Sequence, residues 1–241
     1  MIAALPMYDR PELRPYTDAL WSGIRDTLRD LGVAAPQTLT RNADPWDIWQ
    51  SPDLILAQTC GLPYRARLHD QVALVATPDY GLPGCPPGYY QSVIIARSAD
   101  LPDRPRAAIN DPLSQSGWSA LRVWADAQAM PLDRPFITGA HAASARAVAQ
   151  GKADIAAIDA QTWRHLIMFD QADPSLEIAR TAPTPGLPLI TAPTQDPALI
   201  RQALAAALAA LPEKTRLALD LRGFAQIDAK AYLAHAIPPN P

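Results

Sequence analysis

The chain has 241 residues, of which 49% are hydrophobic and 19% are charged, and its formal net charge is −3 at pH 7. This balance is that of an ordinary globular protein with a sizeable core. A slightly acidic chain without a Lys/Arg-rich run lacks the basic surface that nucleic acid requires, so we expect no nucleic-acid partner.

Membrane, export and metal signals are weak. No stretch approaches the roughly 18 apolar residues of a membrane span, so no span is expected. The first ten residues lack the basic start and apolar core of a signal peptide, which by itself indicates a cytoplasmic location. Cys60 and Cys85 fit a disulfide and two reduced thiols equally well. Their spacing is not that of a zinc site, and we expect neither metal nor cofactor.

The first part of the chain alternates strand and helix patterns. A short strand is expected at 2–7, and an amphipathic helix at 11–31 is closed by Gly32. The further elements expected here are a second strand around Leu39, a helical turn at 44–49, strands at 53–58 and 72–77, a Gly/Pro-rich loop at 78–88 and a strand at 89–97.

The alternation continues to the C-terminus. Strands are expected at 107–109, 135–138, 153–158, 176–180 and 187–191. Helices are expected at 118–129, 198–211, 214–221 and 228–236; one further helix ends at Gly151, and another begins at Asp159. This pattern predicts an α/β fold with largely parallel sheets.

Four polar segments rich in small residues follow apolar runs, at 6–10, 58–61, 110–117 and 139–144. In open α/β sheets, ligands bind beyond the carboxyl ends of strands, where helices begin. The segment 110–117 places hydroxyl and amide side chains beside the backbone N–H groups of a helix start, which suits an oxyanion. The alternative is that Asp111 or Ser114 only caps its own helix.

The segments Asn110–Gly117, Thr138–Ser144 and Gly151–Asp159 resemble those of the phosphate/phosphite/phosphonate-binding proteins of ABC transporters, the PhnD-like family. The resemblance spans about 54–191. It implies a two-lobed type II periplasmic-binding-protein fold with a ligand cleft between the lobes. Lobe one would be 1–96 plus 190–241, and lobe two, 97–189, would be inserted into it.

The resemblance also implies the ligand-binding residues. The hydroxyl cradle of the family matches 114–116, where Gln115 replaces a hydroxyl residue. The histidine of the family matches His141, and its tyrosine before the hinge strand matches Tyr90, with Tyr89 as a fallback. The residues alone also allow a self-capping His141, packing tyrosines and, as the better interpretation, an N-capping Asp159. The full expected set is Ser114, Gln115, Ser116, His141, Tyr90, Asp159, Tyr8, Gln58 and Thr59.

The implied function is that of a solute-binding protein for phosphate, phosphite or a phosphonate, within or derived from an ABC uptake system. A permease partner and a periplasmic location follow from the resemblance, against the cytoplasmic indication of the N-terminus. The alternatives are an anion-sensing domain and a cytoplasmic enzyme of cofactor biosynthesis on the same fold, using His141, Cys60 and Asp159. No nucleophile–base pair or metal spacing is visible, so we expect binding rather than catalysis.

Overall fold

The computed structural model describes residues 1–241 and divides into two compact units. Unit 1 comprises Met1–Tyr89 and Pro185–Ala234, and unit 2 comprises Tyr90–Thr184 and His235–Pro241. The first two borders fall inside β4 (Tyr89–Tyr90) and β10 (Thr184–Pro185), which pair in a two-stranded sheet. None of the helices combines the length and apolar character needed to cross a membrane.

Unit 1 is built on a five-stranded sheet in the order β1 (Ile2–Ala4), β2 (Leu54–Gln58), β11 (Leu189–Thr191), β3 (Ala73–Asp79) and β12 (Gly223–Ala225). β1 and β2 are parallel, whereas β11 runs antiparallel to β2 and β3, and β12 runs antiparallel to β3. Successive side chains of a strand point to opposite faces, so Ala3 and Ala4 enter two different cores.

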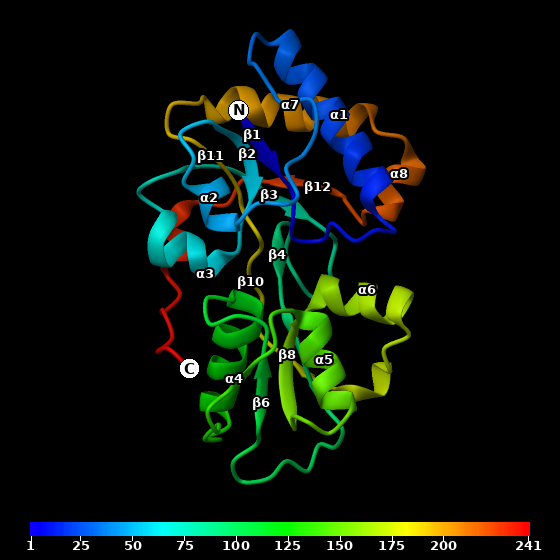
Figure 1. Cartoon of the computed structure of the whole chain (residues 1–241), viewed down its shortest axis with the longest axis vertical. Coiled ribbons are helices and arrows are strands. Elements are labelled where there is room, and N and C mark those ends of the chain that lie inside the picture. The colour runs from blue at the N-terminus through cyan, green and yellow to red at the C-terminus, as the bar shows by residue number, and fades with distance from the viewer. The chain divides into compact units, whose positions relative to one another are not determined.

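Helices cover both faces of this sheet (Figure 1). On one face lie α1 (Arg14–Asp30), α7 (Pro197–Ala210) and α8 (Glu213–Ala218), where Trp21, Ile24 and Leu28 form the apolar stripe of α1. On the other face, the ring of Tyr232 packs at 5.3 Å from that of Tyr64, and its hydroxyl lies 2.6 Å from Thr77 Oγ1. The elements of that face are α2 (Pro45–Trp49), α3 (Gly61–Pro63), the π-helical turn η1 (Tyr64–Leu68) and α9 (Ala229–Leu233).

Unit 2 contains a second five-stranded sheet in the order β7 (Phe136–Ile137), β6 (Ala107–Ile109), β8 (Ile155–Asp159), β5 (Ser92–Ala96) and β9 (Glu177–Arg180). β6 is parallel to β7 and β8, and β5 is antiparallel to β8 and β9. Figure 1 shows helices on either side of the sheet. They are the π-helical turn η2 (Gln115–Ser119) with α4 (Ala120–Ala127), and α5 (His141–Ala149) with α6 (Ala160–Asp170); a 3-10 turn, η3 (Pro174–Leu176), precedes β9.

The α/β class and most elements agree with the sequence pattern, but the expectation of largely parallel sheets is wrong. Both sheets are mixed. β5 follows β4 and β11 follows β10 without a helical crossover, and β5 and β11 are each antiparallel to their neighbours in the sheet. The apolar run 89–97 is broken at Gln91 into two strands. No strand forms around Leu39. The chain there makes one backbone hydrogen bond to β1 instead, from Thr40 N to Ala3 O at 2.7 Å.

Three further differences concern borders and short elements. β12 was not anticipated, because Gly223–Ala225 is too short to show a strand period. The compact units divide at 89/90 and 184/185, and β5 pairs only within unit 2; the lobe borders expected at 96/97 and 189/190 stay predictions. The last seven residues cluster with unit 2. Neither cysteine forms a disulfide.

Candidate ligand-binding site

Three of the expected ligand-binding segments meet at one edge of the unit 2 sheet. β6, β7 and β8 are mutually parallel neighbours, so their carboxyl ends lie side by side. β6 leads to Ser114–Ser116, β7 leads to His141, and β8 ends at Asp159. This is the edge at which open α/β sheets bind ligands.

The cradle after β6 is a widened helical turn. Ser114 is the N-cap of η2, and its Oγ accepts the backbone N–H of Gly117 at 2.9 Å. The N–H of Ser119 donates to Ser114 O at 3.0 Å, an i→i+5 bond of the π type that recurs at functional sites. Ser114 therefore does cap its helix, as the alternative interpretation proposed, and it does so within the cradle. Ser114, Gln115 and Ser116 are each buried.

Gly117 fits the cradle because it has no side chain. A Cβ at this position would collide with Asn110 Oδ1 and would stand 3.0 Å from Ser114 Oγ. Asn110 Oδ1 is itself shielded from solvent and makes no hydrogen bond. The close approach of Asn110 to the backbone thus fixes the shape of the turn, a role that its position at the start of the motif did not reveal.

His141 is the first residue of α5 and reaches across to the cradle. Its Nε2 lies 2.8 Å from Ser116 Oγ. The turn before it requires Gly139, whose φ is +84°, and is tied back by Thr138 Oγ1, which lies 2.7 Å from Ser144 Oγ. The self-capping alternative for His141 is not what forms, because its ring nitrogen bonds Ser116 rather than its own backbone.

Burial lowers the pKa of His141 from 6.5 to about 4, partly opposed by the backbone carbonyl of Ala157. Transfer of an imidazolium into a poorly solvated position is unfavourable, so the ring is neutral at neutral pH. A neutral imidazole contributes a hydrogen-bonding group to the site without adding a full charge.

The structure places Tyr90 and Asp159 in different sheets: Asp159 ends β8 of the five-stranded sheet of unit 2, whereas Tyr90 lies in β4, which pairs with β10. Asp159 is buried at the end of β8, and its Oδ1 accepts the N–H of Thr162 at 2.8 Å. It is therefore an N-cap of α6, as the residues alone had favoured. Tyr90 is buried in β4, and Tyr89 beside it is half-buried.

The remaining expected residues form a separate group in unit 1. Gln58 ends β2, and its Nε2 donates to Tyr80 Oη at 3.3 Å. The ring of Tyr80 meets that of Tyr8 edge to face, with centroids 5.0 Å apart. Thr59 is fully buried, and its Oγ1 makes no hydrogen bond. Tyr80 was missed, although it follows the carboxyl end of β3 as the other candidates follow their strands.

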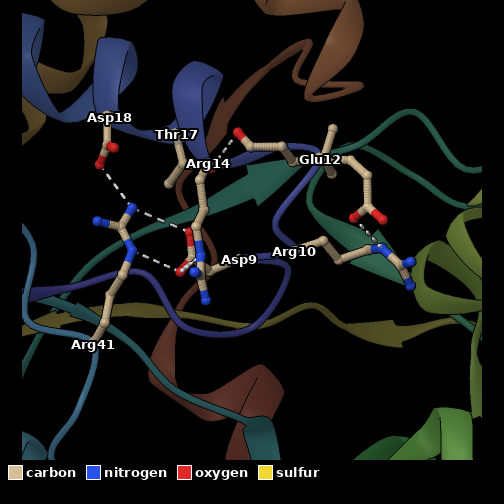
Figure 2. Close-up of polar contacts among 8 residues, drawn as sticks. Asp9, Arg10, Glu12, Arg14, Thr17, Asp18 and Arg41 are labelled. Carbon is tan, nitrogen blue, oxygen red and sulfur yellow. Dashed lines mark hydrogen bonds and ion pairs between the residues drawn. The ribbon is translucent and has the colours of Figure 1, made fainter.

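A network of ion pairs holds the loop that carries Tyr8 (Figure 2). Arg41 donates two hydrogen bonds to Asp9, from Nε at 2.7 Å and from a terminal nitrogen at 3.2 Å, and one to Asp18 at 2.7 Å. Arg14 Nε adds a contact to Asp9 at 3.3 Å. The hydrogen bonds that Arg41 donates to Asp9 and Asp18 raise the pKa of its guanidinium above the usual value.

Metal chemistry has no support among these side chains. No group of three or more His, Cys, Asp or Glu residues is placed to hold a metal ion. The arrangement in unit 2 instead combines backbone N–H groups at a helix start with hydroxyls and a neutral imidazole, which suits the binding of an anion.

Solved structures share this fold. PhnD1 of Prochlorococcus marinus, in complex with methylphosphonate, is 14% identical with a TM-score of 0.70, covering 96% of this chain and 94% of that chain. A Xanthomonas citri protein bound to chloride ion is 14% identical with a TM-score of 0.67, covering 96% and 92%. The binding component of a Pseudomonas aeruginosa ABC phosphonate transporter is 16% identical with a TM-score of 0.64, covering 96% and 82%.

These likenesses define the class of the protein: it has the type II fold of periplasmic binding proteins. The sequence profile of the family described as "ABC transporter, phosphonate, periplasmic substrate-binding protein" matches residues 53–232. This chain therefore belongs to that family, whose members are transport proteins rather than enzymes. No curated protein sequence matches the chain.

Proposed function

We propose that this chain binds a small phosphorus oxyanion (phosphate, phosphite or a phosphonate) for an ABC uptake system, and that the unit 2 cradle is the binding site. The observation that carries the proposal is the 2.8 Å contact between Ser116 Oγ and His141 Nε2 at the start of η2. It brings together two segments that are 25 residues apart in the chain, both of which were expected to bind the ligand.

The cradle offers partial rather than full positive charges. Backbone N–H groups of a first helical turn have no intrahelical acceptor, and their dipoles favour an anion. Ser114, Gln115 and Ser116 supply polar side chains around them, and Gly117 leaves room for the side chain of Asn110 against the turn. Such a site binds a tetrahedral oxyanion without a salt bridge, which keeps release feasible.

The proposal extends to the other expected contacts. Tyr90 lies in β4, the strand that precedes β5, and Asp159 combines its capping role with a position at the ligand edge. In unit 1, Thr59 has a buried hydroxyl that a ligand would satisfy, and Gln58 and Tyr8 accompany it. The transport role makes a permease the partner and the periplasm the place of action, as is typical of the family.

A thermal-shift screen with phosphate, phosphite, methylphosphonate and sulfate tests the proposal. A ligand at 100 times its dissociation constant stabilises the folded state by about 2.7 kcal/mol. We expect a selective response to at least one phosphorus oxyanion. A response only to larger phosphorylated metabolites would favour an anion sensor instead.

Substitution of the cradle locates the site. Ser116→Ala should weaken oxyanion binding by roughly 1.5–3 kcal/mol, the value of a hydrogen bond to a charged group, and leave the fold intact. Titration calorimetry measures the affinity. Ser98→Ala, an exposed serine of the same unit, is the control and should bind as the wild type does. Equal affinities for the two variants would place the site elsewhere.

A further inference from the structure

Unit 1 has a pocket of its own, formed by residues that the proposed oxyanion site does not use. Residues of α7, α8 and β12, together with Ala76 of β3 and Gln226 after β12, line this α7 pocket, and all of them belong to unit 1 (Figure 1). Its volume is about 350 Å³. Small-molecule sites span about 300–1,000 Å³, so the α7 pocket has the size of a site for a small ligand.

The lining of the α7 pocket is largely apolar. One stripe of α7, with members three or four residues apart, faces it together with an aromatic ring of β12; these residues are Leu204, Ala205, Leu208, Ala209 and Phe224. Ala205 and Ala209 are exposed, and Leu208 and Phe224 are half-buried. The stripe therefore leaves apolar surface in contact with water, which a ligand with an apolar body would cover.

Two arginines line the same pocket, Arg201 of α7 and Arg216 of α8. No carboxylate lines it, and neither arginine takes part in an ion pair. Arg201 Nη1 donates to Val75 O at 3.3 Å, which is longer than a good N–H···O bond. A guanidinium has five N–H donors and always carries its charge, so most of the donors of Arg201 are left for another acceptor.

The carboxylate of an adjoining pocket does not neutralise Arg201. That pocket, of about 280 Å³, shares Ala76, Arg201 and Gln226 with the α7 pocket and also contains Asp228. Asp228 is the N-cap of α9, where its Oδ1 accepts the N–H of Lys230 at 2.8 Å. It forms no ion pair with Arg201, so the positive charge beside the apolar stripe has no partner in the chain.

We propose that the α7 pocket binds an organic anion, a small molecule with an apolar body and a single carboxylate or phosphate-ester head. The body covers the α7 stripe and Phe224, which removes apolar surface from water. The head accepts hydrogen bonds from Arg201 and Arg216, because a planar guanidinium matches the oxygens of a carboxylate or a phosphate. This second site goes beyond the oxyanion binding proposed for unit 2 and does not depend on it.

The test is calorimetric titration of the full chain with octanoate, octyl phosphate and octanamide. The three probes share an apolar chain and differ in the charge of the head. We expect at least one of the two anions to bind at least about tenfold more tightly than octanamide, the effect of a hydrogen bond to a charged group. Shortening the chain of that anion should weaken its binding about fourfold for each methylene removed.

Matched variants locate the site. Ala205→Leu narrows the pocket and should weaken binding of the octyl anion about tenfold, whereas Ala206→Leu, at an exposed alanine of α7 outside the pocket, should not. Arg201→Gln and Arg216→Gln keep a polar side chain without the charge, so they should weaken binding of the anion and leave that of octanamide unchanged. Lys214→Gln removes a charge of α8 outside the pocket and is their control.

The comparison of the three probes needs only the wild type, and thermal melting confirms that each variant is folded. Octanamide binding within about tenfold of both anions, or no binding of any octyl probe, overturns the inference. Equal affinity of Ala205→Leu and Ala206→Leu for the octyl anion also overturns it, because the bound site is then elsewhere. Methylphosphonate titrations of the same proteins report on the unit 2 cradle separately, so failure of one proposal is distinguishable from failure of the other.

Discussion

Gly117 shows how one missing methyl group shapes the candidate site. Because a Cβ would strike Asn110 Oδ1, Gly117→Ala must push Asn110 or the η2 turn out of place. We expect a loss of about 1–3 kcal/mol in the free energy of unfolding, the usual cost of overpacking, together with weaker oxyanion binding. Urea denaturation measures the loss.

Gly23 in α1 is the matched control for this substitution. A Cβ there would make an ordinary contact of 3.4 Å with Ala207 Cβ, so Gly23→Ala should gain about 0.5–1 kcal/mol of helix stability. Similar losses at both glycines would show that the close approach of Asn110 does not set the tolerance at Gly117.

His141 makes stability depend on pH. Its folded-state pKa of about 4 lies below the 6.5 of the exposed group, so the unfolded chain binds the extra proton between these values. The contribution is fully present above about pH 6.5 and is lost as the pH falls toward 4, by at most about 3 kcal/mol. Denaturant unfolding at a series of pH values measures it.

His141→Gln is neutral at every pH and should show a shallower acid slope than the wild type. His69→Gln removes an exposed histidine and should keep the slope of the wild type. If both variants lose stability in acid as steeply as the wild type, then other groups cause the decline and His141 is not the residue responsible.

The loop after β1 is held by a charge network as well as by the apolar packing of Leu5 and Met7. Asp9 accepts from Arg41 and Arg14, and its side chain is only 9% exposed. Asp9→Asn leaves two guanidinium groups facing a weaker acceptor, so we expect a loss of about 1–3 kcal/mol of stability. Asp26→Asn removes the solvent-exposed carboxylate that pairs with Arg25 and should change nothing measurable.

The Asp9 variant also tests the position of Tyr8, the preceding residue in the chain. If the network holds the loop, the near-UV circular dichroism of the Tyr8–Tyr80 pair should change together with stability. A variant as stable as the wild type, with an unchanged aromatic signal, would show that the loop is held by its backbone turn alone.

The elements with a clear period could be read from the sequence, and the irregular ones could not. α1 shows its stripe of Leu20, Trp21, Ile24 and Leu28, and β2 shows an unbroken apolar run. The π-helical turn η2 has no such signature, because one extra residue in a turn leaves the surrounding helical pattern almost unchanged. The three residues of β12 gain their strand identity only from pairing with β3.

In the candidate site, too, the local motifs could be predicted from the sequence, whereas the contacts between distant segments could not. Motif position indicated Ser116 and His141 as members of one site, but their contact depends on the parallel order of β6 and β7, which no local pattern encodes. Arg41 and Asp9 are 32 residues apart and join only because the chain around Thr40 returns to β1. The ligand contacts expected of all these residues, Ser114, Gln115, Ser116, His141, Tyr90, Asp159, Tyr8, Gln58 and Thr59, stay predictions.

At the scale of the molecule, unit 2 is an almost continuous piece of chain with its own core. Ile94, Ile155 and Leu121 pack together within 90–184, and only 235–241 comes from elsewhere. We therefore expect a fragment of residues 90–184 to fold alone, as compact domains with their own core generally can. Circular dichroism and a cooperative urea transition measure this.

The fragment should be less stable by about 1 kcal/mol than unit 2 with its tail, because Trp118 Nε1 loses its bond of 2.7 Å to Pro239 O. A second fragment, in which 235–241 is added through a flexible linker, is the control. A fragment without a cooperative transition in either form would show that unit 2 depends on the rest of the chain.

The hydrogen bond between Trp118 and Pro239 also means that the intrinsic fluorescence of Trp118 can report on the cradle and on the C-terminal tail. The indole is buried two residues after Ser116, and its N–H is bound to the C-terminal tail. Indole emission responds to polarity and hydrogen bonding, so anion arrival at the cradle and release of the tail would both change the fluorescence of this one side chain. A dye or fusion attached at Pro241 would perturb the same signal, and labels are therefore better placed at the N-terminus.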